Sequence, residues 1–324
     1  MKRWQRWTGG VLLAGALGCG AFVLAARSGW LRPDDADLRA RYGLPNSQFV
    51  SVGGQALHLV DEGSGPPVIL VHGSYGSLRM WREWVDALKG RHRVIRFDRP
   101  GMGLSGPSPD ARYDGNAEAE LIGKLADHLG LKRFSIVGTS SSGEGVAHYA
   151  AIHPERVDAV ILANIAAGPL VMRPQQRSAM FKAAAFVDPW FKGWHTPALW
   201  RGVLEMNYAD KARVTPELVR EWTDLNNRTQ GWPRKPWPGG KPFAGTPADL
   251  KAITAPTLLL WSDGDPETPV EDDGQRALAL LAAKDKALVT VPNCGHMMPQ
   301  ECGERSAGPA KAFLDRVHFA ADKR

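Results

Sequence analysis

The 324-residue chain is predicted to be an α/β protein, with a mostly parallel sheet covered by helices on both faces and an inserted helical cap. Three observations support this fold class. Short apolar runs alternate along the chain with longer helical stretches, which is the pattern of repeated strand–helix units. One run, Val68–Val71, is apolar at every position, as a strand buried on both faces requires. One long segment has no such run and is rich in tryptophan and proline.

The first elements follow a polar linker that ends near Arg41. Residues 49–59 alternate apolar and polar side chains around Gly53 and Gly54, which predicts a β-hairpin. Six further strands are expected at Val68–Val71, Val94–Phe97, Phe134–Val137, Ala159–Ala163, Thr257–Trp261 and Ala287–Val291. Helical stretches separate most of them, including Ala117–Leu129 and Glu304–Phe319.

The same pattern divides the chain into four predicted segments. Residues 1–32 form a membrane anchor or signal, 33–167 the first part of the sheet domain, 168–250 the helical cap, and 251–324 the second part of the sheet domain. The cap holds six of the twelve tryptophans: Trp190, Trp194, Trp200, Trp222, Trp232 and Trp237. These side chains are expected either to form the core of the cap or to line a substrate pocket.

The N-terminus predicts a membrane segment, because an uncharged stretch runs from Thr8 to Ala26. Basic residues precede it and tryptophans flank it: Lys2, Arg3, Arg6, Trp4, Trp7 and Trp30. A helix from Trp7 to Trp30 rises roughly 34 Å, enough to cross a bilayer. The basic end favours an anchor with the catalytic domain outside the cytoplasm. A signal cleaved after Ala26 is the alternative and would release the domain, and Cys19 offers a weaker lipid-attachment site.

The charge, histidine spacing and cysteine content restrict the kinds of partner and cofactor that the chain is expected to bind. The formal net charge is +6, and residues 1–32 carry +5 of it, so the rest of the chain offers no basic surface for nucleic acid. The histidines show no metal-ligand spacing, and neither a metal nor a cofactor is expected. Cys294 and Cys302 are close enough to pair in an oxidising compartment, and two unpaired thiols remain the alternative. The oligomeric state is left open.

Residues 138–143, Gly-Thr-Ser-Ser-Ser-Gly, carry the chemistry. They follow a predicted strand and lead into a helical stretch. A tight turn of small residues at this junction lifts its middle serine, Ser140, out of the sheet and exposes the hydroxyl to a substrate. The fifth position of the G-x-S-x-G pattern is Ser142 instead of glycine, which still provides a small side chain. The pattern predicts acyl transfer through Ser140.

Four further motifs, together with the serine turn, resemble the α/β-hydrolase family between residues 49 and 313. They are the His72–Ser77 turn, the Asp98–Ser105 loop, the strand ending in Ser262–Asp265, and the Pro292–His296 loop. The resemblance implies a triad in the order Ser140, Asp265, His296. It also implies an oxyanion hole formed by the backbone N–H groups of Ser74 and Ser141.

The physical requirements of acyl transfer agree with this assignment. A serine hydroxyl needs a histidine to remove its proton, and that histidine needs a carboxylate to fix its tautomer. Asp263 stands two residues before Asp265 and is expected in the turn, away from His296. Substrate contacts are expected from Tyr75, Thr139, Trp190, Trp194 and Met297.

The predicted function is hydrolysis of a carboxylic ester, or a related acyl bond, of an apolar small molecule. The family also includes haloalkane dehalogenases and epoxide hydrolases, which place an aspartate at the turn, and Ser140 argues against both. Lactonases, carbon–carbon bond hydrolases, thioesterases and cofactor-free perhydrolases use the same triad and stay open. A non-catalytic ligand receptor is a further alternative, disfavoured because the triad is intact.

Overall fold

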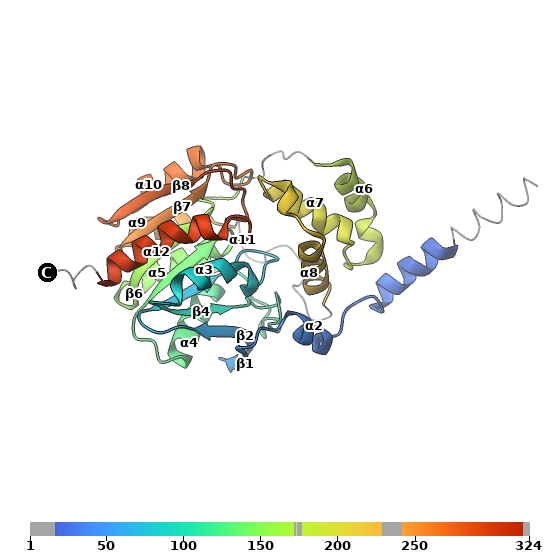
Figure 1. Cartoon of the computed structure of the whole chain (residues 1–324), viewed down its shortest axis with the longest axis horizontal. Helices are drawn as coiled ribbons and strands as arrows, with labels where there is room; N and C mark the ends of the chain where they lie inside the picture. Colours follow the sequence, from blue (N-terminus) through green and yellow to red (C-terminus); the bar gives the residue numbers. More distant parts are fainter. Residues whose placement is uncertain (1–16, 172, 174–176, 229–241, 320–324) are drawn as a thin grey trace, which may run out of the picture.

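The structure is a computed structural model that describes residues 17–171, 173, 177–228 and 242–319. Figure 1 shows a sheet enclosed by helices, a group of helices beside it, and an N-terminal helix projecting from that side. The sheet consists of β1 (Ser47–Val52), β2 (Gln55–Glu62), β3 (Pro67–Val71), β4 (Arg93–Phe97), β5 (Phe134–Thr139), β6 (Val157–Ala163), β7 (Thr257–Ser262) and β8 (Lys286–Val291). Every predicted strand is present, the hairpin as β1 and β2.

The sheet has the strand order β1-β2-β4-β3-β5-β6-β7-β8. Strand β2 is antiparallel to both of its neighbours, and from β4 to β8 all pairs are parallel. The predicted fold class is therefore confirmed. Parallel strands end at one edge of the sheet, so the loops that follow β3, β4, β5, β7 and β8 all lie at that edge. These loops carry the motifs identified in the sequence.

Two apolar cores flank the sheet, and β3 contributes to both. Ile69 and Val71 belong to one core, while Val68 and Leu70 belong to the other, as the alternation of side chains along a strand dictates. The first core is covered by α4 (Gly115–His128), α5 (Ser142–Ile152), α9 (Thr246–Ala252) and α10 (Gln275–Leu280), the second by α3 (Arg82–Leu88), α11 (Met298–Glu301) and α12 (Gly303–Phe319). The predicted helices at 117–129 and 304–319 correspond to α4 and α12.

The segment predicted to be the cap contains α6 (Ala179–Val187), α7 (Pro197–Asn207) and α8 (Pro216–Asn226). Both α7 and α8 begin with Thr-Pro, where the threonine hydroxyl accepts a backbone N–H and proline fills the first helical position. Trp200, Leu204 and Trp222 form an apolar cluster between these helices. Helix α9 begins before residue 250 but packs on α5, with Leu250 in the core of the sheet body.

The N-terminal helix (residues 17–28) packs its Ala26 against Phe191 and Trp194 of the cap segment. No helix in the described part of the chain is long and apolar enough to cross a membrane. Residues 1–16 of the predicted anchor lie outside the described residues, as do Trp232 and Trp237. Helix α2 (Asp35–Tyr42) then leads to the sheet.

Candidate active site

Ser140 lies between β5 and α5 with a φ angle of +53°. This left-handed backbone conformation is unfavourable for a side chain larger than glycine, and it marks a turn held by its surroundings. The surroundings are tight, because a Cβ atom on Gly143 would lie 2.1 Å from a side-chain carbon of Ile165. A small-residue turn between a buried strand and a helix thus presents Ser140 at the edge of the sheet.

Ser142, the departure from glycine in the turn, is fully buried. Its Oγ accepts the N–H of Thr139 at 2.9 Å. The same oxygen lies 2.8 Å from the carbonyl of Val71 on β3 and 2.9 Å from that of Thr139. A serine at this position therefore ties the turn to the neighbouring strand, which a glycine could not do.

The structure brings Ser140, His296 and Asp265 together from three different loops. The Nε2 atom of His296 lies 2.8 Å from Oγ of Ser140, and its Nδ1 lies 2.8 Å from Oδ2 of Asp265. Asp265 also accepts hydrogen bonds from the backbone and hydroxyl of Thr268, which fix the carboxylate. Asp263 is exposed, and its carboxylate faces the N–H of Cys294 at 3.4 Å.

Glu267 is a second carboxylate at His296 that sequence reasoning missed. Its Oε2 lies 3.4 Å from Nε2, the nitrogen that faces Ser140, and the side chain is about one-third exposed (35%). Burial lowers the pKa of His296, but the charges of Asp265 and Glu267 outweigh burial and raise this pKa to about 9. In the sequence, the only sign of a contact between Glu267 and His296 is the position of Glu267 two residues after Asp265. That position does not fix the contact, because the side chain of a loop residue can point in many directions.

The two predicted oxyanion donors lie side by side, because Oγ of Ser74 donates to Oγ of Ser141 at 2.8 Å. Ser141 sits at the N-terminus of α5, where unpaired N–H groups and the helix dipole favour a negative charge. Gly73 allows the turn after β3 to come this close, since a Cβ there would lie 2.9 Å from Cβ of Ser140. Hydrogen-bond donors can thus converge beside the serine hydroxyl.

A buried arginine supports this arrangement from behind. Arg99 donates to Oγ of Ser141 at 2.8 Å and to Glu118 at 3.1 Å, and both charged side chains are almost fully buried. Burial raises the pKa of Glu118 to about 7, although the Arg99 charge opposes the shift. This pair could not be predicted from the sequence, because Arg99 and Glu118 lie in a loop and a helix whose packing is set by the whole fold.

His72 has a supporting role in the same turn. Its Nδ1 lies 2.7 Å from the carbonyl oxygen of Gly73, and its Nε2 accepts the N–H of Arg99 at 2.9 Å. Burial lowers the pKa of His72 to about 4, so the ring is neutral at ordinary pH. This histidine ties the turn after β3 to the loop after β4.

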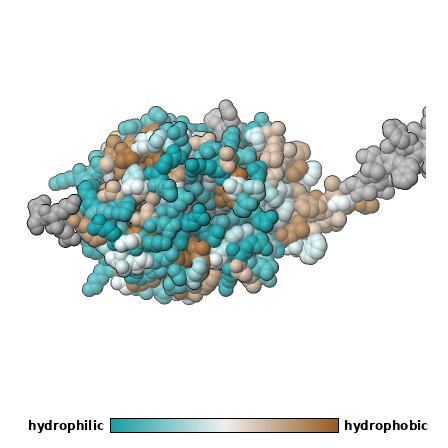
Figure 2. Space-filling view, in the orientation of Figure 1, coloured by the Kyte–Doolittle hydropathy of each residue, from teal (hydrophilic) through white to brown (hydrophobic). Residues whose placement is uncertain are grey.

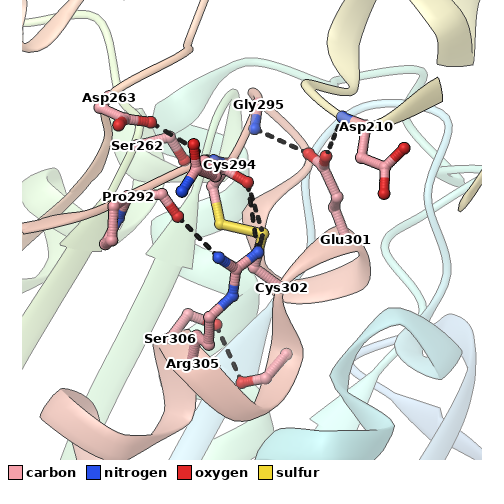
Figure 3. Close-up of a disulfide and its surroundings, with 12 residues drawn as sticks. Asp210, Ser262, Asp263, Pro292, Cys294, Gly295, Glu301, Cys302, Arg305 and Ser306 are labelled. Atoms are coloured by element: carbon pink, nitrogen blue, oxygen red, sulfur yellow. Dashed lines mark hydrogen bonds between the residues drawn. A yellow bond between two sulfur atoms is a disulfide. The ribbon is translucent and has the colours of Figure 1, made fainter.

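A disulfide between Cys294 and Cys302 holds the loop that carries His296 (Figure 3). Glu301 reinforces the loop, since its carboxylate accepts the N–H groups of Gly295 and Asp210, each at 2.7 Å. Asp210 follows α7, so the same carboxylate also connects the histidine loop to the cap segment. The pairing of the two cysteines, which the sequence left open, is present in the structure.

A small cavity at Ser140 is lined by two of the predicted substrate contacts, Thr139 and Met297, and by Ser74, one of the predicted oxyanion donors. Tyr75 stands beside it on the turn after β3, with its ring 5.3 Å from that of Trp200. The structure does not bring Trp190 and Trp194 to this cavity. Trp190 is exposed, and Trp194 is buried against the N-terminal helix. No cluster of three or more metal-ligating side chains occurs in the described part of the chain.

Comparison with known proteins supports the family. Residues 66–300 match the profile of the α/β-hydrolase fold. The chain belongs to the α/β-hydrolase family. Within this family, haloalkane dehalogenase 2 of Mycobacterium tuberculosis is 36% identical over 290 residues, covering 80% of this chain and 91% of the relative.

Two further members of the α/β-hydrolase family cover most of the chain. A 2-hydroxy-6-oxononadienedioate/2-hydroxy-6-oxononatrienedioate hydrolase of Comamonas testosteroni is 26% identical, covering 77% of this chain and 90% of the relative. A crystal structure of a membrane phospholipase A superposes with a TM-score of 0.65 at 25% identity, covering 97% of this chain and 99% of that one. The chain is thus a hydrolase of a family that acts on small-molecule substrates.

Proposed function

We propose that this hydrolase cleaves a carboxylic ester, or a related acyl bond, through an acyl-enzyme on Ser140. The observation that carries the proposal is the chain of short contacts from Ser140 through His296 to Asp265, each 2.8 Å long. As Oγ attacks the substrate carbonyl, Nε2 takes its proton, and Asp265 stabilises the imidazolium that forms.

The following steps use the same groups. The carbonyl oxygen becomes an oxyanion, which accepts hydrogen bonds from the backbone N–H groups of Ser74 and Ser141. Collapse of this intermediate expels the leaving group, which takes the proton from His296, and leaves an acyl ester on Ser140. A water molecule then gives a proton to His296 and attacks the ester, and His296 returns this proton to Oγ of Ser140 as the acid is released.

Dehalogenation, the activity in the name of one relative, does not fit a serine at the turn. Displacement of a halide by Ser140 would leave an alkyl ether, which has no carbonyl for water to attack. The enzyme could not turn over, because a triad hydrolyses acyl groups and not ethers.

Cleavage of a carbon–carbon bond is the second candidate, and the substrate named for the Comamonas testosteroni relative supports it, because a 2-hydroxy-6-oxo dienedioate has no ester bond to hydrolyse. Lactone hydrolysis, thioester hydrolysis and peracid formation need no different catalytic groups, and lactones and thioesters are included in the test below. The cavity beside Ser140 contains Met80 and Met297, and the cap segment supplies further aromatic surface. Burial of such surface contributes about 25 cal/mol per Å², so apolar acyl or aryl groups are the proposed substrates.

A substrate panel tests this proposal. Full-length protein in detergent is assayed with p-nitrophenyl esters, lactones, thioesters and vinylogous 1,5-diketones, each in an apolar and a charged version of similar size. We expect the fastest turnover with apolar esters. Equal rates for charged and apolar versions would refute the apolar preference, and activity on the diketones alone would replace ester cleavage by carbon–carbon cleavage.

We also propose that the N-terminal segment holds the enzyme at a membrane, with the catalytic domain outside the cytoplasm, or directs its secretion by a cleaved signal. The Cys294–Cys302 disulfide supports an oxidising compartment. Full-length protein is then expected in the membrane fraction after carbonate washing. A soluble species that starts near Arg27 would instead indicate a cleaved signal, and an intact cytosolic species would refute both.

A further inference from the structure

Large apolar side chains are exposed on one side of the molecule. Within the described residues, twelve large apolar side chains are exposed, and seven of them lie in the N-terminal helix region or in α6 and the turn after it: Leu17, Phe22, Leu24, Trp30, Met180, Phe186 and Trp190. Phe186 is 74% exposed and Trp190 is 54% exposed. Figure 2 shows apolar surface at the end of the body from which the N-terminal helix emerges.

Direct contacts join the two parts of this surface. The ring of Phe22 lies edge-on to the rings of Phe191 and Trp194, at 5.8 and 5.5 Å between centroids. On the cap segment, the rings of Phe186 and Trp190 lie next to each other, with 6.0 Å between their centroids. We call residues 17–31 and 179–194 together the apolar end. Its inner side chains are buried between the two segments, whereas its outer ones have no cover in the described structure.

The charges around the apolar end are mostly positive. Residues 17–32 and 177–195 contain five basic residues and one acidic residue: Arg27, Arg32, Arg177, Lys182, Lys192 and Asp188. The single carboxylate, that of Asp188, lies 2.8 Å from Nδ1 of His195. Aromatic side chains interleaved with lysine and arginine are typical of surfaces that bind the headgroup region of anionic bilayers.

We propose that the apolar end is a membrane-docking surface, in which the α6 region of the cap inserts into the lipid interface beside the N-terminal helix. In the sequence, the apolar end directly follows the segment predicted to enter the bilayer, which has no charged residue from Thr8 onward. Docking through the cap as well as the N-terminus fixes the orientation of the catalytic domain on the membrane. This inference concerns the placement of the enzyme and does not depend on which bond Ser140 cleaves.

A second copy of the chain is the competing occupant, and the charges argue against it. Two copies facing each other through this surface would bring two sets of five basic residues together, with one acidic residue on each side. Like charges at close range disfavour such a pair, whereas phosphate headgroups neutralise them.

Site-directed spin labelling tests the docking. Full-length protein with Cys19→Ser, which leaves only the disulfide cysteines, receives a nitroxide at Phe186→Cys and is reconstituted into vesicles of phosphatidylcholine with some phosphatidylglycerol. Ile152→Cys, at the end of α5 and 51% exposed, is the matched control. Both labels are compared in their collision rates with oxygen, which concentrates in lipid, and with a water-soluble nickel complex.

The label at 186 is expected to collide mainly with oxygen and the label at 152 mainly with nickel. Equal access of nickel to both labels, or failure of the protein to bind the vesicles, refutes the docking surface. Spin–spin broadening at position 186 at high protein density, with nickel excluded, would show that a second copy covers the surface and would also refute it.

An activity measurement adds an independent result. Phe186→Glu is expected to slow hydrolysis of a long-chain ester embedded in the vesicles by about tenfold, since it removes one inserted side chain. Hydrolysis of a water-soluble short ester and the Ile152→Glu control should stay unchanged. Equal loss on both substrates would contradict docking. If the wild type cleaves no ester, the proposed function fails while the labelling result still decides the docking.

Discussion

Asp263 and Asp265, two residues apart after β7, can be distinguished by substitution, because of these two only Asp265 contacts Nδ1 of His296. Asp265→Asn leaves an amide that donates to the histidine and selects the wrong tautomer, so turnover should fall by about 10³-fold or more. Asp263→Asn changes an exposed carboxylate whose contact is a 3.4 Å approach to a backbone N–H, and it should cost far less. Steady-state kinetics with one ester rank the two variants. A larger loss for Asp263→Asn would overturn the assignment of the acid.

The raised pKa of His296, about 9, determines the acid limb of the pH profile, which is the range where kcat/KM increases with pH. Only the neutral imidazole can take the serine proton, so kcat/KM should increase with pH until His296 has lost its proton. Glu267→Gln removes one of the charges that stabilise the imidazolium. This substitution should therefore lower the pKa and move the acid limb to lower pH.

A matched variant separates this effect from a general change of charge. Glu271 is an exposed carboxylate four residues farther along, in the short helical segment Val270–Gly274, and Glu271→Gln should leave the acid limb where it is. The measurement is kcat/KM for a neutral ester between pH 5 and 10. The assignment is wrong if both variants give the wild-type limb.

At the scale of elements, the disulfide restrains the loop between β8 and α12. Cross-linking residues eight apart in sequence removes freedom mainly from the unfolded chain, and for this loop length it contributes roughly 2–3 kcal/mol to the free energy of unfolding. Replacing Cys294 and Cys302 by alanine should remove about that amount and also lower kcat, because His296 lies within the loop. Urea unfolding and kinetics measure the two effects, with Cys19→Ser as the control. Unchanged stability and turnover would show that the loop needs no cross-link.

The order of the elements could be predicted from sequence because each parallel strand leaves a compact apolar signal. The runs at 68–71, 134–137 and 257–261 became β3, β5 and β7 with shifts of only a few residues at their ends. The limit of the cap was harder to place, since α9 has a helical sequence like the cap helices. Only the burial of Leu250 against the sheet body shows where α9 packs.

At the scale of the whole molecule, packing between segments far apart in the sequence determines those site contacts that could not be predicted from the sequence. Ser140, Asp265 and His296 could be predicted because each stands in a short motif after a predicted strand, and the family resemblance implies their roles. Glu267 and the Arg99–Glu118 pair were missed, because their contacts depend on how loops and helices pack across the edge of the sheet that carries these motifs. The direction of the Trp190 side chain depends likewise on the turn after α6. That turn places Trp190 at the apolar end and not at the cavity beside Ser140.

The central claim is that Ser140 becomes acylated, and trapping the covalent adduct tests it most directly. The protein is treated with a fluorophosphonate, digested and mapped by mass spectrometry, alongside Ser140→Ala and Ser141→Ala. We expect one adduct on the peptide with Ser140 in the wild type, its loss together with esterase activity in Ser140→Ala, and its retention in Ser141→Ala. An adduct on another residue, or esterase activity that survives in Ser140→Ala, would contradict the account.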